Sequence, residues 1–271
     1  MFSLDPRGGH NRYKFKADFF EKWTPEMAYV LGFLYADGDI EDVKKSSRTQ
    51  YITFSSVDKD ILEAIRRALG SEHNLNYIAP QKVTYGNGKI YESSESYRLR
   101  IGSKKMFNDL LKLGLTPRKS LIIKFPQEIP NNCLSHFIRG YFDGDGCVTI
   151  NRGIGKKGQQ ILKGINVIFT SGSRDFLEGL CKKACSVAKF YDKKVYDCRK
   201  HSRSYQLKYP TPESIKWFKF LYSNNSSDLF LKRKFDIFKK YFELRSCRID
   251  KKVASVLNSY KQGGVAKKLT R

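Results

Sequence analysis

The chain has 271 residues, with 51 lysines and arginines against 27 acidic residues and a formal charge of +24 at pH 7. This length is enough to bury a large core, in one domain or in two smaller ones. Such an excess of positive charge indicates a polyanionic partner, and it favours nucleic acid over an anionic membrane surface. The longest apolar run, residues 27–36, is about half a membrane span, and residues 1–16 lack the apolar core of a secretory signal. We predict a soluble, non-secreted protein that does not bind membranes.

An apolar helical segment that closes with Asp-Gly occurs twice, at residues 30–38 and 138–146. Each copy has small residues four positions apart: Gly32 and Ala36 in the first, Gly140 and Gly144 in the second. Small residues at this spacing lie on one helix face and let two backbones approach closely. We therefore expect the two helices to pack directly on each other.

This packing would bring Asp37 beside Asp145 at the C-terminal ends of the two helices. The helix dipole disfavours negative charge there, and two nearby carboxylates repel each other. A divalent cation would relieve both costs. Three further acids, Asp39, Glu41 and Asp42, have no acidic counterparts in the second copy, so we assign them to the surface of a hairpin.

The repeat continues beyond these segments. Residues 54–63 match residues 169–178, and both read as a strand end that runs into a helix. Residues 97–101 match residues 205–209, with strict alternation of apolar and polar positions that is typical of a half-buried strand. A weaker match pairs residues 116–119 with residues 231–234.

The order in each copy is helix, two strands, helix, two strands, helix. We predict an α+β fold with two αββαββα halves, residues 25–122 and 133–244, related by a pseudo-twofold axis and packed through their first helices. Residues 123–132 form a linker, because Pro126 and Pro130 forbid a continuous helix.

Two flanks lie outside the repeat. Residues 1–24 form an N-terminal extension, and residues 245–271 form a basic tail. Residues 253–269 resemble a helix, a Gly263-Gly264 break and the start of a second helix, as in a truncated helix-turn-helix. We favour the simpler interpretation of a solvated basic tail that adds affinity for nucleic acid.

The six cysteines show no paired framework, so we predict free thiols. One subset has spacing compatible with a zinc site: Cys181, Cys185, Cys198 and His201. We favour a structural interpretation, in which Cys181 belongs to the apolar core stripe of a helix and acts as a small hydrophobic residue.

The paired segments resemble the LAGLIDADG motifs of homing endonucleases, in the single-chain form that carries two motifs. The resemblance covers about residues 25–244. It implies a monomeric, site-specific endonuclease whose antiparallel sheets form a saddle on a long, non-palindromic site in double-stranded DNA. It also implies hydrolysis of one phosphodiester on each strand, giving a staggered break. The alternative is an intron RNA maturase or a non-cleaving DNA-binding protein on the same scaffold. The compartment stays open between bacterial or phage cytoplasm and an organelle matrix.

The resemblance implies that Asp37 and Asp145, with the backbone carbonyls of Ala36 and Gly144, hold divalent metal. Mg²⁺ suits this role because it takes oxygen ligands and keeps waters that can act as nucleophile. We expect Mn²⁺ to substitute and Ca²⁺ to support binding without cleavage. The sixth motif position, Tyr35 in the first copy and Asp143 in the second, is not a metal ligand in this family.

The family also places a polar residue behind the metal site and a basic residue near the cut phosphate. The repeat assigns the polar role to Ser56 and Ser171, although relatives often have glutamine there. Lys119 and Lys234 are the candidates for the basic role, and the alternative for both is a solvated helix end.

DNA binding is expected on the sheets, because Leu99, Ile101 and Leu207 face the helices and the alternating residues then face outward. Arginine and glutamine on two-stranded ribbons can pair with base edges in the major groove, and basic loops can grip phosphates. The candidate DNA contacts are Lys44, Arg48, Thr49, Tyr51, Thr53, Arg98, Arg100, Asn151, Arg152, Lys156, Lys157, Asn166, Thr170, Lys194, Arg199, Arg203, Gln206 and Lys208.

Overall fold

The computed structural model describes residues 13–43, 49–84, 88, 90–198, 204–223 and 228–266. Up to residue 121 the elements are α1 (Pro25–Asp37), β1 (Gly38–Val43), β2 (Thr49–Ser56), α2 (Lys59–Ala68), β3 (Asn76–Ile78), β4 (Lys82–Thr84), β5 (Ile90–Glu92), β6 (Ser96–Gly102), α3 (Lys104–Lys112) and the 3-10 helix η1 (Lys119–Leu121). The later elements are α4 (Asn131–Asp145), β7 (Gly146–Ile154), β8 (Gln160–Ser171), α5 (Arg174–Ala188), β9 (Tyr196–Asp197), β10 (Tyr205–Tyr209), α6 (Thr211–Tyr222), α7 (Lys232–Leu244), η2 (Ser246–Arg248) and α8 (Lys251–Ala266).

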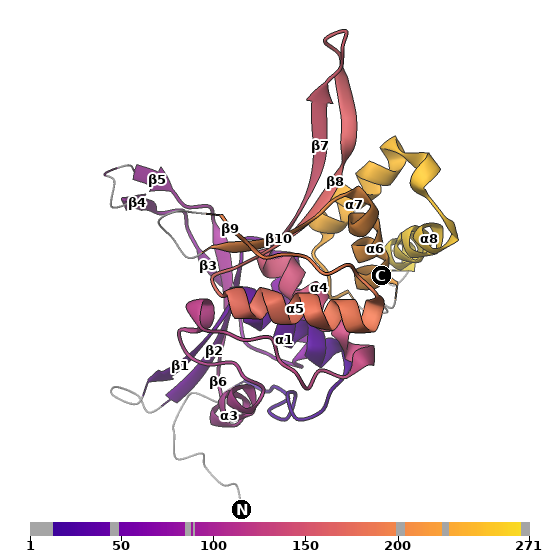
Figure 1. Cartoon of the computed structure of the whole chain (residues 1–271). Coiled ribbons are helices and arrows are strands. Elements are labelled where there is room, and N and C mark those ends of the chain that lie inside the picture. Colours follow the sequence, from indigo (N-terminus) through magenta and orange to yellow (C-terminus); the bar gives the residue numbers. More distant parts are fainter. Residues whose placement is uncertain are drawn as a thin grey trace, which may run out of the picture.

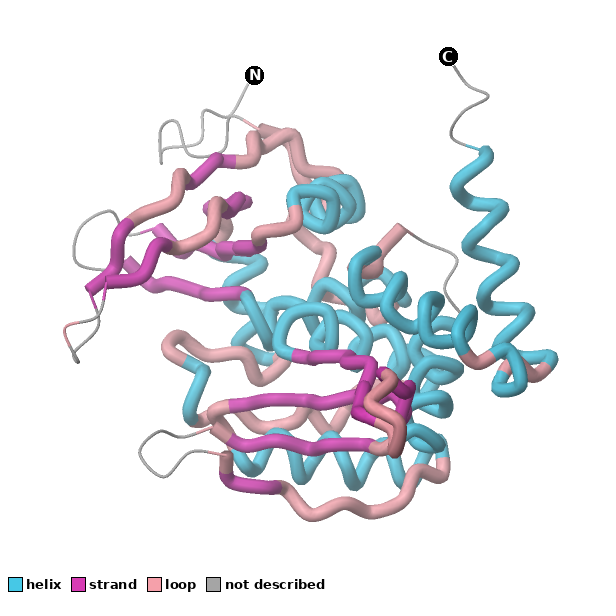
Figure 2. Tube along the Cα trace, turned by 90° about the horizontal axis from the view of Figure 1, so that it is seen from above, coloured by secondary structure: helices cyan, strands magenta, loops and turns pink. Residues whose placement is uncertain are grey.

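The strands form two four-stranded antiparallel sheets, ordered β1-β2-β6-β3 and β7-β8-β10-β9. A separate ribbon, β4-β5, was not expected from the sequence. Figure 1 shows α1 and α4 side by side in the middle of the molecule, and Figure 2 shows strands in two groups with helices between them. The predicted α+β fold with two equivalent sheets is confirmed.

The α1–α4 contact is a direct contact of two backbones. A Cβ atom on Gly32 would lie 2.0 Å from the carbonyl oxygen of Phe137, and one on Gly140 would lie 2.0 Å from that of Tyr29. The two contacts are reciprocal, as a pseudo-twofold axis between the helices requires. Any side chain at either glycine would push the helices apart, so the prediction from small-residue spacing is confirmed.

α1 begins at a recognisable capping signal, and both α1 and α4 end at a glycine. The Thr24 hydroxyl accepts a hydrogen bond from the N–H of Met27 (3.1 Å) and Pro25 follows in the first turn, which together start α1. At the other end, each helix passes directly into a strand at Gly38 or Gly146. A Cβ on Gly38 would lie 2.4 Å from the Leu34 side chain, so glycine is required immediately after the aspartate.

The apolar alternation positions the sheets on the helices. Leu99, Ile101 and Leu207 are fully buried, whereas Arg98, Arg100 and Lys208 are exposed on the opposite face, as predicted. β7 and β8 extend past the body of the protein as a long two-stranded arm (Figure 1). Among the described residues, none of the helices combines the length and apolar character needed to cross a membrane.

The tail after residue 244 differs from the prediction. Val253 and Val256 on α8 are buried, and the Tyr260 ring lies 4.2 Å from the Phe235 ring, so this helix is docked and is not a solvated tail. Asp250 Oδ1 accepts the N–H of Val253 (3.0 Å), which fixes the start of the helix. The backbone stays helical through Gly263 and Gly264, so the predicted break, and with it the truncated helix-turn-helix, is wrong within the described residues.

Candidate metal and nucleic-acid site

The last residues of α1 and α4 bring Asp37 and Asp145 together. A Cβ on Gly144 would lie 2.3 Å from the Ala36 Cβ and 3.2 Å from Asp37 Oδ2, so the Asp37 carboxylate rests against the final turn of the opposite helix. Both aspartates reach the surface, while Ala36 and Gly144 behind them are partly buried. The structure therefore brings together the four residues that the sequence analysis assigned to metal.

The electrostatics of the two carboxyls favour a cation. Burial, followed by repulsion from Asp37, raises the pKa of Asp145 to about 6, although Lys119 and Lys234 lower it. Burial also raises the pKa of Asp37, against the positive charges of Lys234, Lys119 and Arg233. The negative charge of each carboxylate thus remains disfavoured, because the two lysines offset only part of the effect of burial.

Lys119 and Lys234 occupy equivalent positions behind the helix ends. Lys119 Nζ donates to the carbonyl oxygens of Ala36 (3.2 Å) and Gly38 (2.6 Å). Lys234 Nζ lies within hydrogen-bond distance of those of Gly144 (3.2 Å) and Gly146 (2.5 Å), and also of those of Phe142 (2.6 Å) and Asp143 (2.8 Å). Burial lowers the pKa of both lysines, whereas neighbouring carboxylates raise it.

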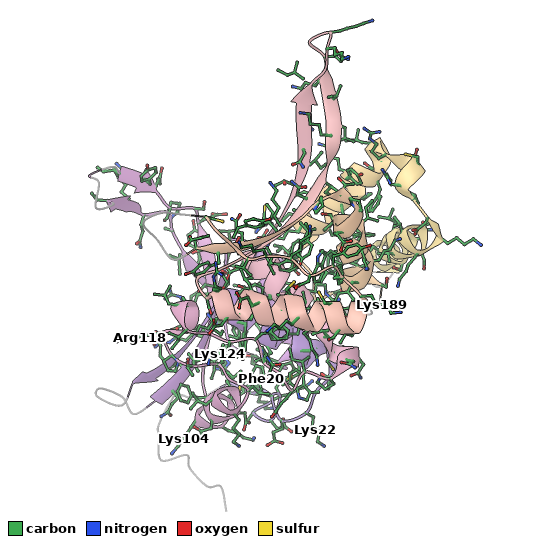
Figure 3. The ribbon with its side chains drawn as sticks, in the orientation of Figure 1. Phe20, Lys22, Lys104, Arg118, Lys124 and Lys189 are labelled. Atoms are coloured by element: carbon green, nitrogen blue, oxygen red, sulfur yellow. The ribbon has the colours of Figure 1, made fainter. Side chains whose placement is uncertain are left out.

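These two side chains are only 6% and 4% exposed, so the interpretation of Lys119 and Lys234 as solvated helix ends is wrong. Their positive charges lie at helix C-termini, where the dipole favours cations. Lys119 is directed inward by a left-handed backbone at Arg118 (φ 57°), which is labelled in Figure 3. Lys234 lies in the first turn of α7.

The sixth motif position anchors the segment that carries the lysine of its own half. The Tyr35 hydroxyl donates to the carbonyl oxygen of Leu113 (2.6 Å), shortly before Lys119. Asp143 Oδ2 accepts the backbone N–H of Leu231 (2.8 Å), shortly before Lys234, and the hydroxyl of Tyr29 (2.7 Å). The two halves therefore carry different residues at this position. In the first half the tyrosine hydroxyl donates to a backbone carbonyl, and in the second half the aspartate accepts a backbone N–H.

Ser56 and Ser171 have matching local contacts. Each hydroxyl accepts a backbone N–H two residues later, from Asp58 and Ser173 respectively, both at 3.1 Å. These turns connect β2 to α2 and β8 to α5. A role in positioning water remains a prediction for both serines.

The sequence analysis missed Tyr141. Its buried hydroxyl donates to the carbonyl oxygen of Thr170 (2.7 Å); donation of the same O–H to Asp145 instead lowers the pKa of that carboxyl. The equivalent residue in the first copy is Phe33, which has no hydroxyl. This difference between the copies was the only available signal.

The outer face of the first sheet carries the predicted contacts in register. Thr53 pairs with Arg100, and Tyr51 with Glu41. The Arg100 guanidinium lies 3.7 Å from the centre of the Tyr51 ring and 2.8 Å from Glu41 Oε2. Glu41 lies on the hairpin surface as expected, and it also forms an ion pair with Arg100, one of the candidate DNA contacts. Thr53 is on the expected face but is only 9% exposed, since its neighbours cover it.

The second sheet has the same arrangement. Thr170 pairs with Gln206, and Asn166 pairs with Thr149. A shallow hollow on this face is lined by Asn166, Tyr196, Gln206, Lys208 and Pro210. Asn166 is 8% exposed and forms part of its floor. Tyr196, which the sequence analysis did not propose, adds an exposed ring beside the predicted contacts.

The arm corrects one prediction. Arg152 lies within β7 and not in a basic loop, and a β-bulge separates it from Asn151. Lys156 and Lys157 are exposed at the turn between β7 and β8, and Lys194 is exposed in the loop before β9.

Five of the candidate DNA contacts lie partly or wholly outside the part of the chain that the structure describes. Lys44, Arg48, Arg199 and Arg203 lie outside the described residues, and only the backbone of Thr49 is described.

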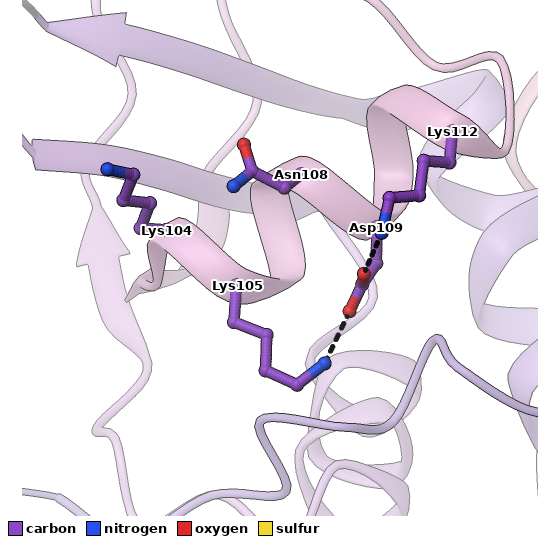
Figure 4. Close-up of a pocket in the computed structure, with 5 residues that line it drawn as sticks. All are labelled: Lys104, Lys105, Asn108, Asp109 and Lys112. Carbon is purple, nitrogen blue, oxygen red and sulfur yellow. Dashed lines mark hydrogen bonds and ion pairs between the residues drawn. The ribbon is translucent and has the colours of Figure 1, made fainter.

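A separate hollow lies on α3, lined by Lys104, Lys105, Asn108, Asp109 and Lys112 (Figure 4). Asp109 forms ion pairs with Lys105 (2.9 Å) and Lys112 (3.5 Å). Since α3 packs against β2 on the helical side of the sheet, this hollow is not part of the outer sheet face.

Residues 132–182 match the LAGLIDADG-like domain. An uncharacterized protein of Methanocaldococcus jannaschii is 26% identical over 132 residues, which are 48% of this chain and 41% of that protein. The DNA-directed RNA polymerase subunit Rpo1C of the same organism is 28% identical over 156 residues, 57% of this chain and 15% of that subunit. The chain thus spans less than half the length of these two curated relatives.

The structure of the homing endonuclease I-WcaI bound to its DNA recognition sequence is similar to this one with a TM-score of 0.52 and 12% identity, covering 81% of this chain and 90% of that one. Its fold agrees with the two sheets and the central helix pair described above. This chain therefore carries a LAGLIDADG-like domain at residues 132–182 and has the fold of the single-chain LAGLIDADG homing endonucleases.

Proposed function

We propose that this protein is a site-specific endonuclease that cuts both strands of a long, non-palindromic DNA site, leaving a staggered break. The observation that carries this proposal is the duplicated centre at the α1–α4 interface. Each copy has a carboxylate at the helix end, Asp37 or Asp145, and a buried lysine bound to the carbonyls beside it. Two equivalent centres at one interface suit the hydrolysis of two antiparallel strands.

The donor set fits a hard divalent cation such as Mg²⁺. Asp37, Asp145 and the carbonyl oxygens of Ala36 and Gly144 would hold it, and all four donors are oxygen atoms. Each of these carbonyls uses one lone pair for a lysine, so a second lone pair remains for a metal. When bound, the metal would activate a water and stabilise the leaving oxygen. Mn²⁺ would substitute, and Ca²⁺ would support binding alone.

The two lysines would divide their roles unequally. An ammonium group has three N–H donors. Lys234 Nζ lies within hydrogen-bond distance of four carbonyl oxygens and has no donor to spare, so it would position the helix end. Lys119 Nζ contacts two carbonyls, which leaves one N–H for a phosphate oxygen. In both halves the positive charge would also offset the charge of the carboxylates.

The outer sheet faces would read the DNA. Arg98, Arg100, Gln206 and Lys208 point away from the helices and have the donors needed to pair with base edges. Lys156, Lys157 and Lys194 would grip phosphates. Residues 25–122 and 133–244 would each read one half of the site, and the long β7–β8 arm would follow the duplex. One chain then provides both halves, so a monomer would suffice.

The test begins with selection of bound duplexes from host genomic DNA in Ca²⁺, followed by exchange into Mg²⁺ and mapping of cuts on both strands. Asp37→Asn and Asp145→Asn should bind the selected site and fail to cut both strands. Asp39→Asn, which removes the same charge from a neighbouring residue outside the motif, is the matched control and should still cut.

Double-strand cutting by either motif variant would overturn the assignment of the metal ligands. Tight binding of the wild-type protein with no cut in Mg²⁺ or Mn²⁺ would support a non-cleaving binder instead. RNA binding that outcompetes the duplex at matched salt would support a maturase.

A further inference from the structure

Three potential metal ligands meet beside the C-terminal half of α5. Cys181 and Cys185 lie one turn apart on this helix, and Asp192 lies in the loop that follows it. One ligand atom of each, the two sulfurs and a carboxylate oxygen, all lie within 4.8 Å of one another. Cys181 Sγ and Asp192 Oδ1 are 3.5 Å apart. The ligand atoms around a tetrahedral zinc ion, with bonds of about 2.0–2.3 Å, lie roughly as far apart as these two atoms.

The loop is folded back so that Asp192 reaches the helix. α5 ends at Ala188, and Lys189, labelled in Figure 3, takes a left-handed backbone (φ 54°) while its N–H donates to the carbonyl of Cys185 (3.0 Å). Residues 190–193 then return along the helix, and the N–H of Lys193 donates to Cys181 Sγ (3.3 Å). The ligands are therefore preorganised by backbone geometry.

The Cys181 sulfur has two acceptors, Asp192 Oδ1 and the Lys193 carbonyl, and two donors beside it. In addition to the Lys193 N–H, the Tyr209 hydroxyl lies 3.8 Å from Cys181 Sγ and points its donor at it. Hydrogen bonds from N–H and O–H groups to a sulfur stabilise its thiolate form, which is the form that binds metal. An apolar core cysteine would not require these donors.

A buried carboxylate lies beside the cluster. Glu213, near the start of α6, is 7% exposed, and its Oε2 has no hydrogen-bond partner among the described residues. Its negative charge lies close enough to act on Cys185 of the cluster. A buried carboxylate oxygen without a partner is costly, and a nearby cation would remove that cost.

We propose that Cys181, Cys185 and Asp192 bind one Zn²⁺ ion, with Glu213 or a water bound to it in the fourth position. Thiolate ligands select zinc over Mg²⁺, so this site would not compete with the Asp37–Asp145 site for its metal. The ion would fasten the loop at residues 189–195 to α5 and so fix the approach to β9, the edge strand of the second sheet. It is a structural site and stands independently of the proposed nuclease activity.

The ligand set differs from the one suggested by sequence spacing. Cys198 is exposed, and its Sγ contacts the carbonyl of Tyr196 (3.8 Å), away from the cluster. His201 lies outside the described residues. Cys181 is buried in the core stripe as predicted. The same residue would thus pack in the core and also bind the metal.

The full chain, purified in a non-thiol reductant and stripped with a chelator, is titrated with Co²⁺ and then with Zn²⁺. We expect one Co²⁺ per chain with a thiolate-to-cobalt charge-transfer band and intense visible bands of tetrahedral cobalt, and displacement by one equivalent of Zn²⁺. Cys185→Ser and Asp192→Asn should lose this signal while the circular dichroism spectrum stays native. Cys198→Ser and Cys247→Ser, which change exposed thiols, are the matched controls and should keep it.

The charge-transfer band should also persist in Asp37→Asn, because that residue belongs to the other centre. Absence of the band in the wild-type protein, or an unchanged band in Cys185→Ser, would overturn the proposal. Zinc content measured by mass spectrometry on the protein as purified provides a second readout, with one ion expected per wild-type chain.

Discussion

The contact between Ala36 and Gly144 offers a quantitative test of the helix interface. Replacing Gly144 by alanine would place its Cβ 2.3 Å from the Ala36 Cβ, whereas two carbon atoms pack at about 3.5–4.0 Å. The helices would have to separate by more than about 1 Å, and overpacking of this kind costs about 1–3 kcal/mol. The gain in helix propensity from glycine to alanine, about 1 kcal/mol, acts in the opposite direction.

A double-mutant cycle separates these two effects. Ala36→Gly removes the opposing methyl group, so the double variant exchanges the two residues across the interface and restores the space. The propensity effects of the two substitutions cancel, and the coupling energy measures the clash. We expect the double variant to be within about 1 kcal/mol of the wild-type protein, with a coupling energy of about 1–3 kcal/mol.

The assay is urea unfolding at 25 °C, followed by the fluorescence of the two tryptophans. Ca²⁺ binding by the same variants reports on the carboxylates, since Asp37 Oδ2 would lie 3.2 Å from the new methyl group. Gly144→Ala alone should weaken Ca²⁺ binding. Additive effects, with a coupling energy below about 0.5 kcal/mol, would show that the two residues are not in contact and would refute the interface.

Three further results are expected. Protons compete with metal for the Asp145 carboxyl, whose pKa is about 6, so Ca²⁺ affinity at this residue should fall about tenfold per pH unit below pH 6. Equal Ca²⁺ affinity at pH 7 and pH 5, measured by calorimetry, would contradict this. Lys234→Met removes a buried ammonium group that contacts four carbonyl oxygens and should cost more unfolding free energy than Lys119→Met, which removes one that contacts two; urea unfolding with the reverse order would exclude the assigned contacts. Glu41→Gln releases Arg100 from its ion pair and should tighten duplex binding, so an unchanged affinity in a binding titration would argue against contact of Arg100 with DNA.

Sequence patterns predicted the features that depend on short spacing. Gly32 and Gly140 were identifiable as contact points because residues four apart share a helix face whatever surrounds them. The inward direction of Leu99 and the outward direction of Arg98 followed from strand alternation in the same way. The repeat then placed Asp37 and Asp145 together, since two equivalent segments related by an axis meet at equivalent positions.

Features that depend on distant parts of the chain could not be predicted. The partners of Lys234 are carbonyls about ninety positions away, and a lysine beside an apolar stretch gives no sign that it is buried. Docking of α8 is decided by packing of Val253 and Val256, which are buried against the rest of the protein.

The backbone contact between α1 and α4 has a geometric consequence for the proposed enzyme. Because Gly32 and Gly140 leave no side chains to compress or rearrange, main-chain atoms set the separation of the two helices where these glycines lie. The helix pair thus fixes the distance between the two reaction centres. The offset between the two cuts would then be the same whatever DNA sequence is bound. Substitutions on the outer sheet faces could then change which sequence is bound without changing that offset.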